Sequence, residues 1–142
     1  MVKKSIIVPH TPAQMYSLVS DIAHYPDYLP WCPKTVIKDQ TETNVVASVY
    51  IEYLKIKTHF TTQNVYVLDK SINMYLVDGP FKELVGTWLF TPLGNDCCKI
   101  DFRLQYKFSN IVIEKLIGPV FEFVSKNIVD CFVKQAKKQY GK

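Results

Sequence analysis

Hydrophobic residues recur at every second position through much of residues 35–108, and this alternation constrains the fold more than any other feature. In its clearest stretch, Ile100 and Phe102 alternate with the charged residues Asp101 and Arg103. Successive side chains of a strand point to opposite faces, so the pattern predicts antiparallel sheet with one buried and one solvated face. Its breaks predict about six strands joined mostly by short turns. The breaks fall near residues 39–44, 69–71, 78–80 and 92–96.

Beyond residue 108 the apolar residues recur every three to four positions, which predicts one long amphipathic helix. Asn110 is a suitable N-cap, and Glu114 lies near the positive end of the helix dipole. If the helix runs to Gln139, it has about 30 residues and is roughly 45 Å long. Gly118 and Pro119 interrupt it early and predict a kink.

The N-terminal region predicts a short strand followed by a short helix. Residues 5–9 are rich in β-branched side chains and close on a proline. Thr11 can cap the helix, Pro12 suits its first position, and Gln14 can complete a capping box. The helical spacing of apolar residues that follows should end before Pro26.

The order of elements predicts an α+β fold. We expect a curved antiparallel sheet of about six to seven strands wrapped around the long C-terminal helix, with a short N-terminal helix, which is the helix-grip arrangement. Residues 1–142 are expected to form a single domain. The pattern leaves open whether the space between sheet and helix is an apolar cavity or a solid core.

The connector after the first helix is unusually apolar. It combines Pro26, Pro30 and Pro33, which oppose helix propagation, with the large side chains of Tyr28 and Trp31. Ordinary linkers are polar and rich in Gly, Ser, Asn or Asp. We therefore expect this segment to be a lid, a wall or a contact surface that closes one end of the sheet–helix space.

Composition and charge exclude several classes of protein. Hydrophobic residues make up 48% of the chain and charged residues 21%, which is typical of a globular domain. The net charge of +4 fits weak attraction to polyanions, including RNA and an anionic membrane. The four cysteines show no CxxC spacing, which argues against a metal site or a disulfide framework. No stretch resembles a secretory signal or a membrane span of roughly 20 apolar residues, so we expect a cytoplasmic location.

Two groups of motifs give the chain a specific resemblance to a known family. They are Tyr25-Pro26 followed by Leu29-Pro30-Trp31-Cys32, and Asp78-Gly79-Pro80-Phe81-Lys82 followed by Leu84, Gly86, Trp88 and Phe90-Thr91-Pro92-Leu93. With these segments the chain resembles the START-like helix-grip family that contains coenzyme Q-binding proteins and the bacterial RatA ribosome association toxins. The similarity runs nearly end to end, and the motifs are nearer to the RatA type.

The resemblance implies an apolar cavity that holds a hydrophobic ligand. In the coenzyme Q branch this ligand is ubiquinone, and the protein is a carrier or chaperone for respiration. In the RatA branch the protein binds the large ribosomal subunit and blocks its association with the small one. Our first expectation is a non-enzymatic protein that binds ubiquinone or a similar isoprenoid lipid and has no cofactor. The alternative is a RatA-type toxin that acts on the large ribosomal subunit, and transient contact with a membrane surface is a further expected interaction.

The expected ligand-binding residues are mostly large apolar side chains. Trp88 should face inward, and Gly86 beside it should leave room where another side chain would fill space. Asp78-Gly79-Pro80 predicts a sharp corner between strands, with Phe81 at the cavity mouth near the apolar connector. The full set is Tyr28, Leu29, Trp31, Phe60, Met74, Phe81, Trp88, Phe102, Phe121 and Val124.

Sequence motifs give little support for catalysis, and no catalytic residue is assigned. His10, His24 and His59 are the only histidines, and all three are expected to be exposed. Nucleophile-elbow, metalloprotease and phosphate-binding glycine motifs are absent from the sequence.

Lysines cluster at the C-terminal end of the chain. They are Lys134, Lys137, Lys138 and Lys142. We interpret them as a solvated helix end that interacts favourably with the helix dipole. An electrostatic contact with ribosomal RNA or membrane is the alternative.

Overall fold

Seven strands form one antiparallel sheet in the computed structural model, which describes residues 1–141. Their order across the sheet is β1-β7-β6-β5-β4-β3-β2. The strands are β1 (Val2–Val8), β2 (Thr35–Gln40), β3 (Asn44–Tyr53), β4 (Ile56–Val67), β5 (Ser71–Asp78), β6 (Phe81–Pro92) and β7 (Cys98–Phe108). The helices are α1 (Pro12–Ser20), the 3-10 turn η1 (Ile22–His24), α2 (Tyr25–Tyr28) and α3 (Ile111–Tyr140).

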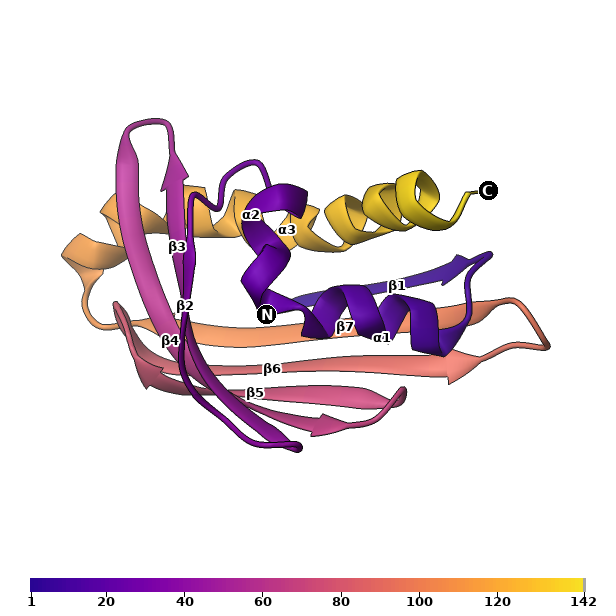
Figure 1. Cartoon of the computed structure of the whole chain (residues 1–142). Coiled ribbons are helices and arrows are strands. Elements are labelled where there is room, and N and C mark those ends of the chain that lie inside the picture. The colour runs from indigo at the N-terminus through magenta and orange to yellow at the C-terminus, as the bar shows by residue number, and fades with distance from the viewer. Residues whose placement is uncertain (142) are drawn as a thin grey trace.

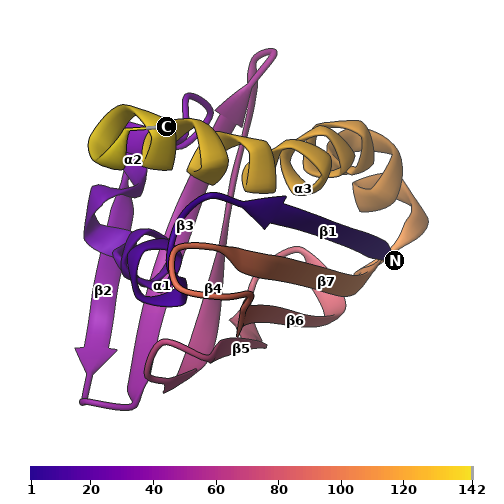
Figure 2. The same cartoon turned by 90° about the vertical axis from the view of Figure 1, so that its right-hand side faces the viewer.

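The sheet bends around the long helix. Figure 1 shows α3 lying along one side of the sheet, with α1 and α2 on that same side. Figure 2 shows strands β2 to β4 running steeply across the direction of β6 and β7, so that the sheet forms a curved wall. The arrangement confirms the predicted α+β helix-grip fold, and its single sheet contains the six strands predicted after residue 35 together with β1.

The alternation in β7 corresponds to the two faces of the sheet, as predicted. Ile100 and Phe102 are buried, whereas Lys99 and Arg103 are exposed. On the neighbouring strand β6, Trp88 pairs with Phe102 and is 2% exposed, with 4.4 Å between the two ring centroids. The predicted inward orientation of Trp88 is therefore confirmed.

Helix α3 has the predicted start and length. Asn110 Oδ1 accepts a hydrogen bond from the Ile113 N–H at 2.9 Å, and Glu114 lies in the first turn. The helix contains 30 residues and continues through Gly118 and Pro119 as one element. Pro119 therefore does not divide the helix, and the kink expected there stays a prediction.

The short helices differ from expectation at the prolines. The predicted capping box is present, because Thr11 Oγ1 accepts from the Gln14 N–H at 3.1 Å and Gln14 Oε1 accepts from the Thr11 N–H at 2.9 Å. Helix α1 ends before Pro26 as expected, but Tyr25–Tyr28 then forms a further helical turn. Pro26 fits there because it lies in the first turn, where a backbone N–H has no intrahelical partner. The expectation that this connector is non-helical is wrong for Tyr25–Tyr28 and correct for residues 29–34.

The corner between β5 and β6 depends on a glycine. Gly79 has a φ of +147°, which L side chains rarely adopt. A Cβ at this position would lie 2.9 Å from the Cβ of Phe60 on β4. Glycine thus permits both the turn and the close approach of the turn to β4, which confirms the predicted structural role of Asp78-Gly79-Pro80.

Candidate functional site

An internal cavity lies between the sheet and α3, and its volume is about 60 Å³. Pockets for drug-sized ligands usually have volumes of about 300–1,000 Å³. An engineered apolar cavity of about 150 Å³ accommodates a single benzene. The space in this protein therefore accommodates neither a quinone ring nor an isoprenoid chain unless side chains move.

The cavity wall is apolar except for a few uncharged groups. Thr62 donates a hydrogen bond to Asn64 Oδ1 at 2.8 Å, and Ser125 donates to the Glu122 carbonyl oxygen at 3.1 Å. Among the described residues that line the cavity, none is Asp, Glu, His, Lys, Arg or Cys. The wall can orient a neutral polar group, but it offers no carboxylate or imidazole for proton transfer.

Most residues expected to bind a ligand lie in this wall. Seven of the ten do so, namely Leu29, Trp31, Phe60, Met74, Trp88, Phe102 and Val124. Tyr28, Phe81 and Phe121 are not part of it. Tyr28 packs its ring on Phe132 instead, with 6.4 Å between ring centroids. Whether any of these residues binds a ligand stays a prediction.

Residues that the sequence-based set omitted complete the wall. They include Ala47, Val49, Thr62, Asn64, Leu104 and Ser125. A signal for two of them was present in the sequence, because Thr62 and Asn64 are polar at inward-facing positions of an alternating strand. Small or polar residues at such positions are where a core is most weakly filled.

Phe81 and Phe121 belong to an aromatic cluster at the other end of the sheet–helix space. The cluster consists of Phe60, Phe81, Tyr106, Phe108 and Phe121. Phe121 on α3 lies at its centre, with ring-centroid distances of 4.8 Å to Phe81 and 4.7 Å to Tyr106. Phe81 therefore fills space between sheet and helix, and its expected position at a cavity mouth beside the apolar connector is wrong. Both Figure 1 and Figure 2 show the β5–β6 turn well away from α2.

The room expected beside Trp88 is also filled. A Cβ on Gly86 would lie 2.3 Å from the terminal methyl carbon of Met74 and 3.1 Å from Leu104 Cδ1. Met74 pairs with Gly86 across β5 and β6, so its flexible side chain covers the glycine. The expectation that Gly86 leaves open space is wrong, because a residue on the neighbouring strand occupies that space.

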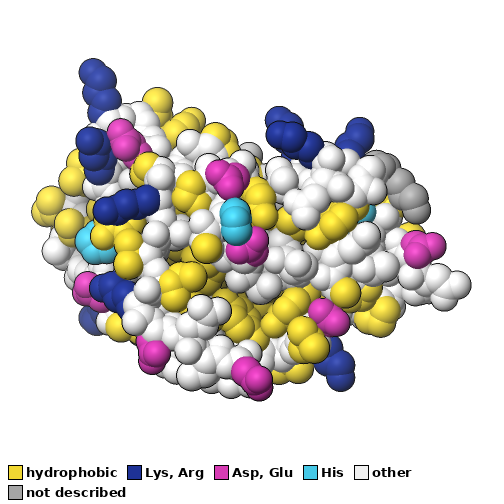
Figure 3. Space-filling view, in the orientation of Figure 1, with side chains coloured by type: hydrophobic (Ala, Val, Ile, Leu, Met, Phe, Trp, Pro, Cys, Tyr) yellow, Lys and Arg dark blue, Asp and Glu magenta, His cyan; other side chains and the backbone are white. Residues whose placement is uncertain are grey.

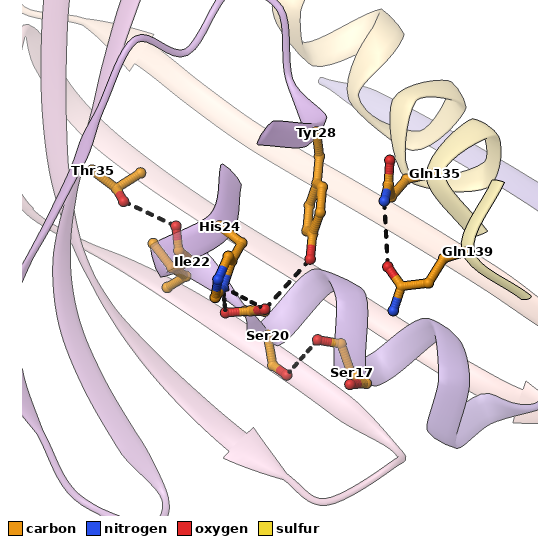
Figure 4. Close-up of polar contacts among 9 residues, drawn as sticks. Ser17, Ser20, Ile22, His24, Tyr28, Thr35, Gln135 and Gln139 are labelled. Carbon is orange, nitrogen blue, oxygen red and sulfur yellow. Dashed lines mark hydrogen bonds and ion pairs between the residues drawn. The ribbon is translucent and has the colours of Figure 1, made fainter. Parts of the chain in front are cut away.

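A short network of polar contacts around Asp21 holds the apolar connector in place. Figure 4 shows His24 and Tyr28 converging on one carboxylate; Asp21 lies 2.8 Å from His24 Nδ1 and accepts from the Tyr28 hydroxyl at 3.4 Å. Thr35 donates to the Ile22 carbonyl oxygen at 2.9 Å, and this bond joins β2 to η1. The connector is therefore a fixed wall in this conformation.

Trp31 separates the internal cavity from a shallow surface groove along α3. Its side chain lines both spaces, and the groove also contains Phe123 and Cys131. The indole Nε1 is buried, and the Trp31 side chain interacts with the neighbouring Cys131 thiol.

The histidines and cysteines lie outside the described wall of the cavity. His24 and His59 are exposed as expected, but His10 is only 3% exposed and its ring centroid lies 6.0 Å from that of Tyr140, so its expected exposure is wrong. Burial raises the pKa values of the Cys32 and Cys98 thiols to about 11, which leaves them protonated near neutral pH. Within residues 1–141 no group of three or more potential metal ligands occurs.

Two basic surfaces differ in their surroundings. Lys134, Lys137 and Lys138 are exposed on the last turns of α3, and Lys142 lies outside the described residues. On the outer face of β3 and β4, the rings of Tyr50 and His59 stack with 4.9 Å between centroids, and Lys34 Nζ lies 4.5 Å from the Tyr50 centroid. Of these two surfaces, the second combines a lysine with the half-buried Tyr50 ring and the exposed His59 ring. No helix within residues 1–141 is long and apolar enough to cross a membrane.

Residues 8–133 match the protein family described as polyketide cyclase / dehydrase and lipid transport. The match covers most of the chain, and the protein belongs to this family.

Relatives with similar sequences over nearly the whole chain include proteins named as ribosome association toxins. The ribosome association toxin RatA of Vibrio cholerae is 42% identical over 140 residues, which cover 99% of this chain and 97% of that protein. The persistence and stress-resistance toxin PasT of Escherichia coli O6:H1 is 41% identical, with 99% and 89% covered. The mitochondrial coenzyme Q-binding protein COQ10 homolog B of Xenopus laevis is 26% identical over 91% of this chain and 54% of that protein. These relatives confirm the resemblance found in the sequence.

A solved structure confirms the architecture. The Zhui aromatase/cyclase from Streptomyces sp. R1128 has a TM-score of 0.87 over 98% of this chain and 94% of its own. Its sequence identity is 12%, so the likeness concerns the fold alone.

Proposed function

We propose that this protein is a RatA-type factor that binds the large ribosomal subunit and blocks its association with the small subunit. Full-length identity of 42% to a protein named ribosome association toxin supports this proposal. The cavity volume of about 60 Å³ bears on the lipid alternative alone, because a lipid would need a larger space. The order of the two sequence-based expectations is thereby reversed.

The Tyr50–His59 surface is the part of the molecule best suited to ribosomal RNA. Aromatic faces can stack on unpaired bases, and lysines such as Lys34 and Lys57 can contact phosphates. Lys57 is 77% exposed in its side chain, and its nearest carboxylate oxygen, on Glu52, is 3.9 Å away. A surface-exposed pair at that distance leaves the ammonium available to a stronger anion.

Cosedimentation with purified large subunits tests this proposal. Binding should weaken as salt is raised, and the double variant Lys34→Glu/Lys57→Glu should bind more weakly, with a salt slope reduced by about 1 per lysine that contacts phosphate. The matched control is Lys137→Glu/Lys138→Glu, which reverses the same charge on the last turn of α3. Failure of the unmodified protein to cosediment with large subunits at low salt would contradict the proposed binding to the ribosome.

A second candidate function is non-enzymatic binding of a ubiquinone-like lipid. The apolar wall of the cavity supports it, and so does the resemblance to COQ10 homolog B. Binding would require the Met74 and Trp31 side chains to move, because the present space is too small. Mass spectrometry of lipid extracts and thermal unfolding with short-chain ubiquinone test the idea. Ligand at 100 times its dissociation constant stabilises the folded state by about 2.7 kcal/mol. Absence of both a copurified lipid and a thermal shift would reject it.

A further inference from the structure

The tip of the β3–β4 hairpin has an unfavourable sequence for its shape. Leu54 and Lys55 form the two-residue turn, and their φ values of 49° and 67° both lie in the left-handed region. Turns of this kind favour Asn-Gly, and a bulky leucine at positive φ is strained. Leu54 is nevertheless 75% exposed, so no packing in the folded chain explains its presence. Strain of this kind is a reason to look for a function at the hairpin tip.

The tip adjoins an exposed apolar face of α3. Tyr53, next to Leu54, stacks on Phe123 with 4.4 Å between ring centroids and 6° between ring planes. Val112 and Leu116 precede Phe123 by three and two helical turns, so they lie on the same side of α3. They are 69% and 56% exposed. Leu54, Val112, Leu116 and Phe123 together form what we call the hairpin–helix patch.

Lysines surround this patch. Lys55 follows Leu54 in the hairpin turn, Lys57 follows two residues later, Lys115 precedes Leu116, and Lys126 comes three residues after Phe123 on α3. Figure 3 shows dark blue Lys or Arg side chains among yellow side chains over the β3–β4 hairpin. Lys126 pairs with Glu122 at 2.7 Å and Lys57 with Glu52 at 3.9 Å, whereas neither Lys55 nor Lys115 forms an ion pair within residues 1–141. The patch therefore offers uncompensated positive charge beside exposed aliphatic side chains.

The chemistry of the patch distinguishes among partners. Protein interfaces are enriched in Tyr, Trp and Arg and depleted in Lys. RNA offers stacking surfaces and phosphates, but no apolar medium for Leu54, Val112 and Leu116. A bilayer interface accepts aliphatic side chains into the acyl region and attracts flanking lysines to anionic headgroups.

The position of the patch agrees with contact with lipid. Phe123 lines the surface groove whose opposite wall includes Trp31, and Trp31 also lines the internal cavity. We propose that the hairpin–helix patch is a docking surface for an anionic lipid bilayer, with Leu54 inserted between headgroups. This proposal does not rest on the ribosomal role.

Flotation with vesicles tests the docking surface. The full chain should bind vesicles that contain phosphatidylcholine and phosphatidylglycerol, and should bind pure phosphatidylcholine more weakly. Leu54→Asn should reduce binding about tenfold, because a buried leucine side chain is lost from the interface. The same change should raise the melting temperature, because asparagine suits the turn. Lys55→Gln should reduce binding about fivefold, only on anionic vesicles.

Leu68→Asn is the matched control. Leu68 is 74% exposed, and it follows β4 at the end opposite the hairpin. This variant should bind vesicles as the unmodified protein does. The proposal is overturned if the unmodified protein fails to bind anionic vesicles at low salt, or if Leu54→Asn binds them as well as Leu68→Asn does. Loss of ribosome binding by Leu54→Asn with vesicle binding unchanged would assign the patch to the ribosome instead.

Discussion

The two ends of the space between sheet and helix are filled in different ways. At one end Phe121 packs against four other aromatic rings, which fill the space between sheet and helix. At the other end Ala47, Thr62 and Ser125 face a space of about 60 Å³. The same two layers therefore close completely or incompletely according to side-chain size at a few positions. Room for a ligand is thus a property of those side chains and does not follow from the helix-grip fold.

The largest loss of stability should follow removal of the central ring of the aromatic cluster. Phe121→Ala removes the central ring of the cluster and should lower the free energy of unfolding by about 3–5 kcal/mol. Val124→Ala, one turn further along α3, removes less volume at the cavity end and should cost about 2 kcal/mol. Urea unfolding measures both. Equal losses in the two variants would mean that the ends are packed alike.

A smaller loss of stability is expected when a side chain in the cavity wall is shortened. Met74 is half-buried, so Met74→Ala should cost about 2 kcal/mol, at the low end for methionine truncation. The variant should also bind benzene or a similar small apolar molecule that the unmodified protein excludes. Calorimetric titration measures the binding. If the variant stays unable to bind such a molecule, then the wall collapses into the vacated space.

The contact between Met74 and Gly86 allows a test of coupling. Gly86→Ala should cost about 1–3 kcal/mol in the unmodified protein, because its Cβ would lie 2.3 Å from the Met74 terminal methyl carbon. In a Met74→Ala background the same change should cost less, since only the Leu104 contact at 3.1 Å remains. A double-mutant cycle measures the difference. Additive costs would show that Met74 does not occupy the space over Gly86.

The smallest effect concerns pH and the polar network that holds the connector. The hydrogen bond from His24 to Asp21, together with the negative charge of Asp21, raises the pKa of His24 above 6.5. The protonated imidazole therefore stabilises the fold in full below pH 6.5, and this contribution is lost as pH rises through the raised pKa. The melting temperatures of the unmodified protein and His24→Asn should converge over that range. A difference that grows with pH would contradict the network.

The elements of the fold were predictable because their signals are local. Alternation in β7 predicted its buried and exposed faces, and Thr11 with Gln14 predicted the start of α1. Pro26 misled the prediction, although the preference of proline for the first turn of a helix is also a local rule. Seven of the ten expected ligand-binding residues line the cavity. Four of these seven lie on strands, where the same alternation identifies inward positions.

The parts that the sequence did not reveal depend on contacts between distant segments. Met74 covers Gly86 only because β5 and β6 pair in that register. His10 is buried because Tyr140, at the far end of the chain, lies beside it. Phe81 has aromatic neighbours from β4, β7 and α3, which no spacing along the chain indicates. The cavity volume depends on all such contacts between distant segments, so it could not be predicted from the sequence.

Light scattering from purified ribosomal subunits tests the central claim most directly. Mixed large and small subunits scatter more light as they associate, and a factor that occupies the large subunit should reduce this increase in proportion to its concentration. The account predicts such inhibition by the unmodified protein and weaker inhibition by Lys34→Glu/Lys57→Glu. Full association of the subunits in the presence of excess protein at low salt would contradict it.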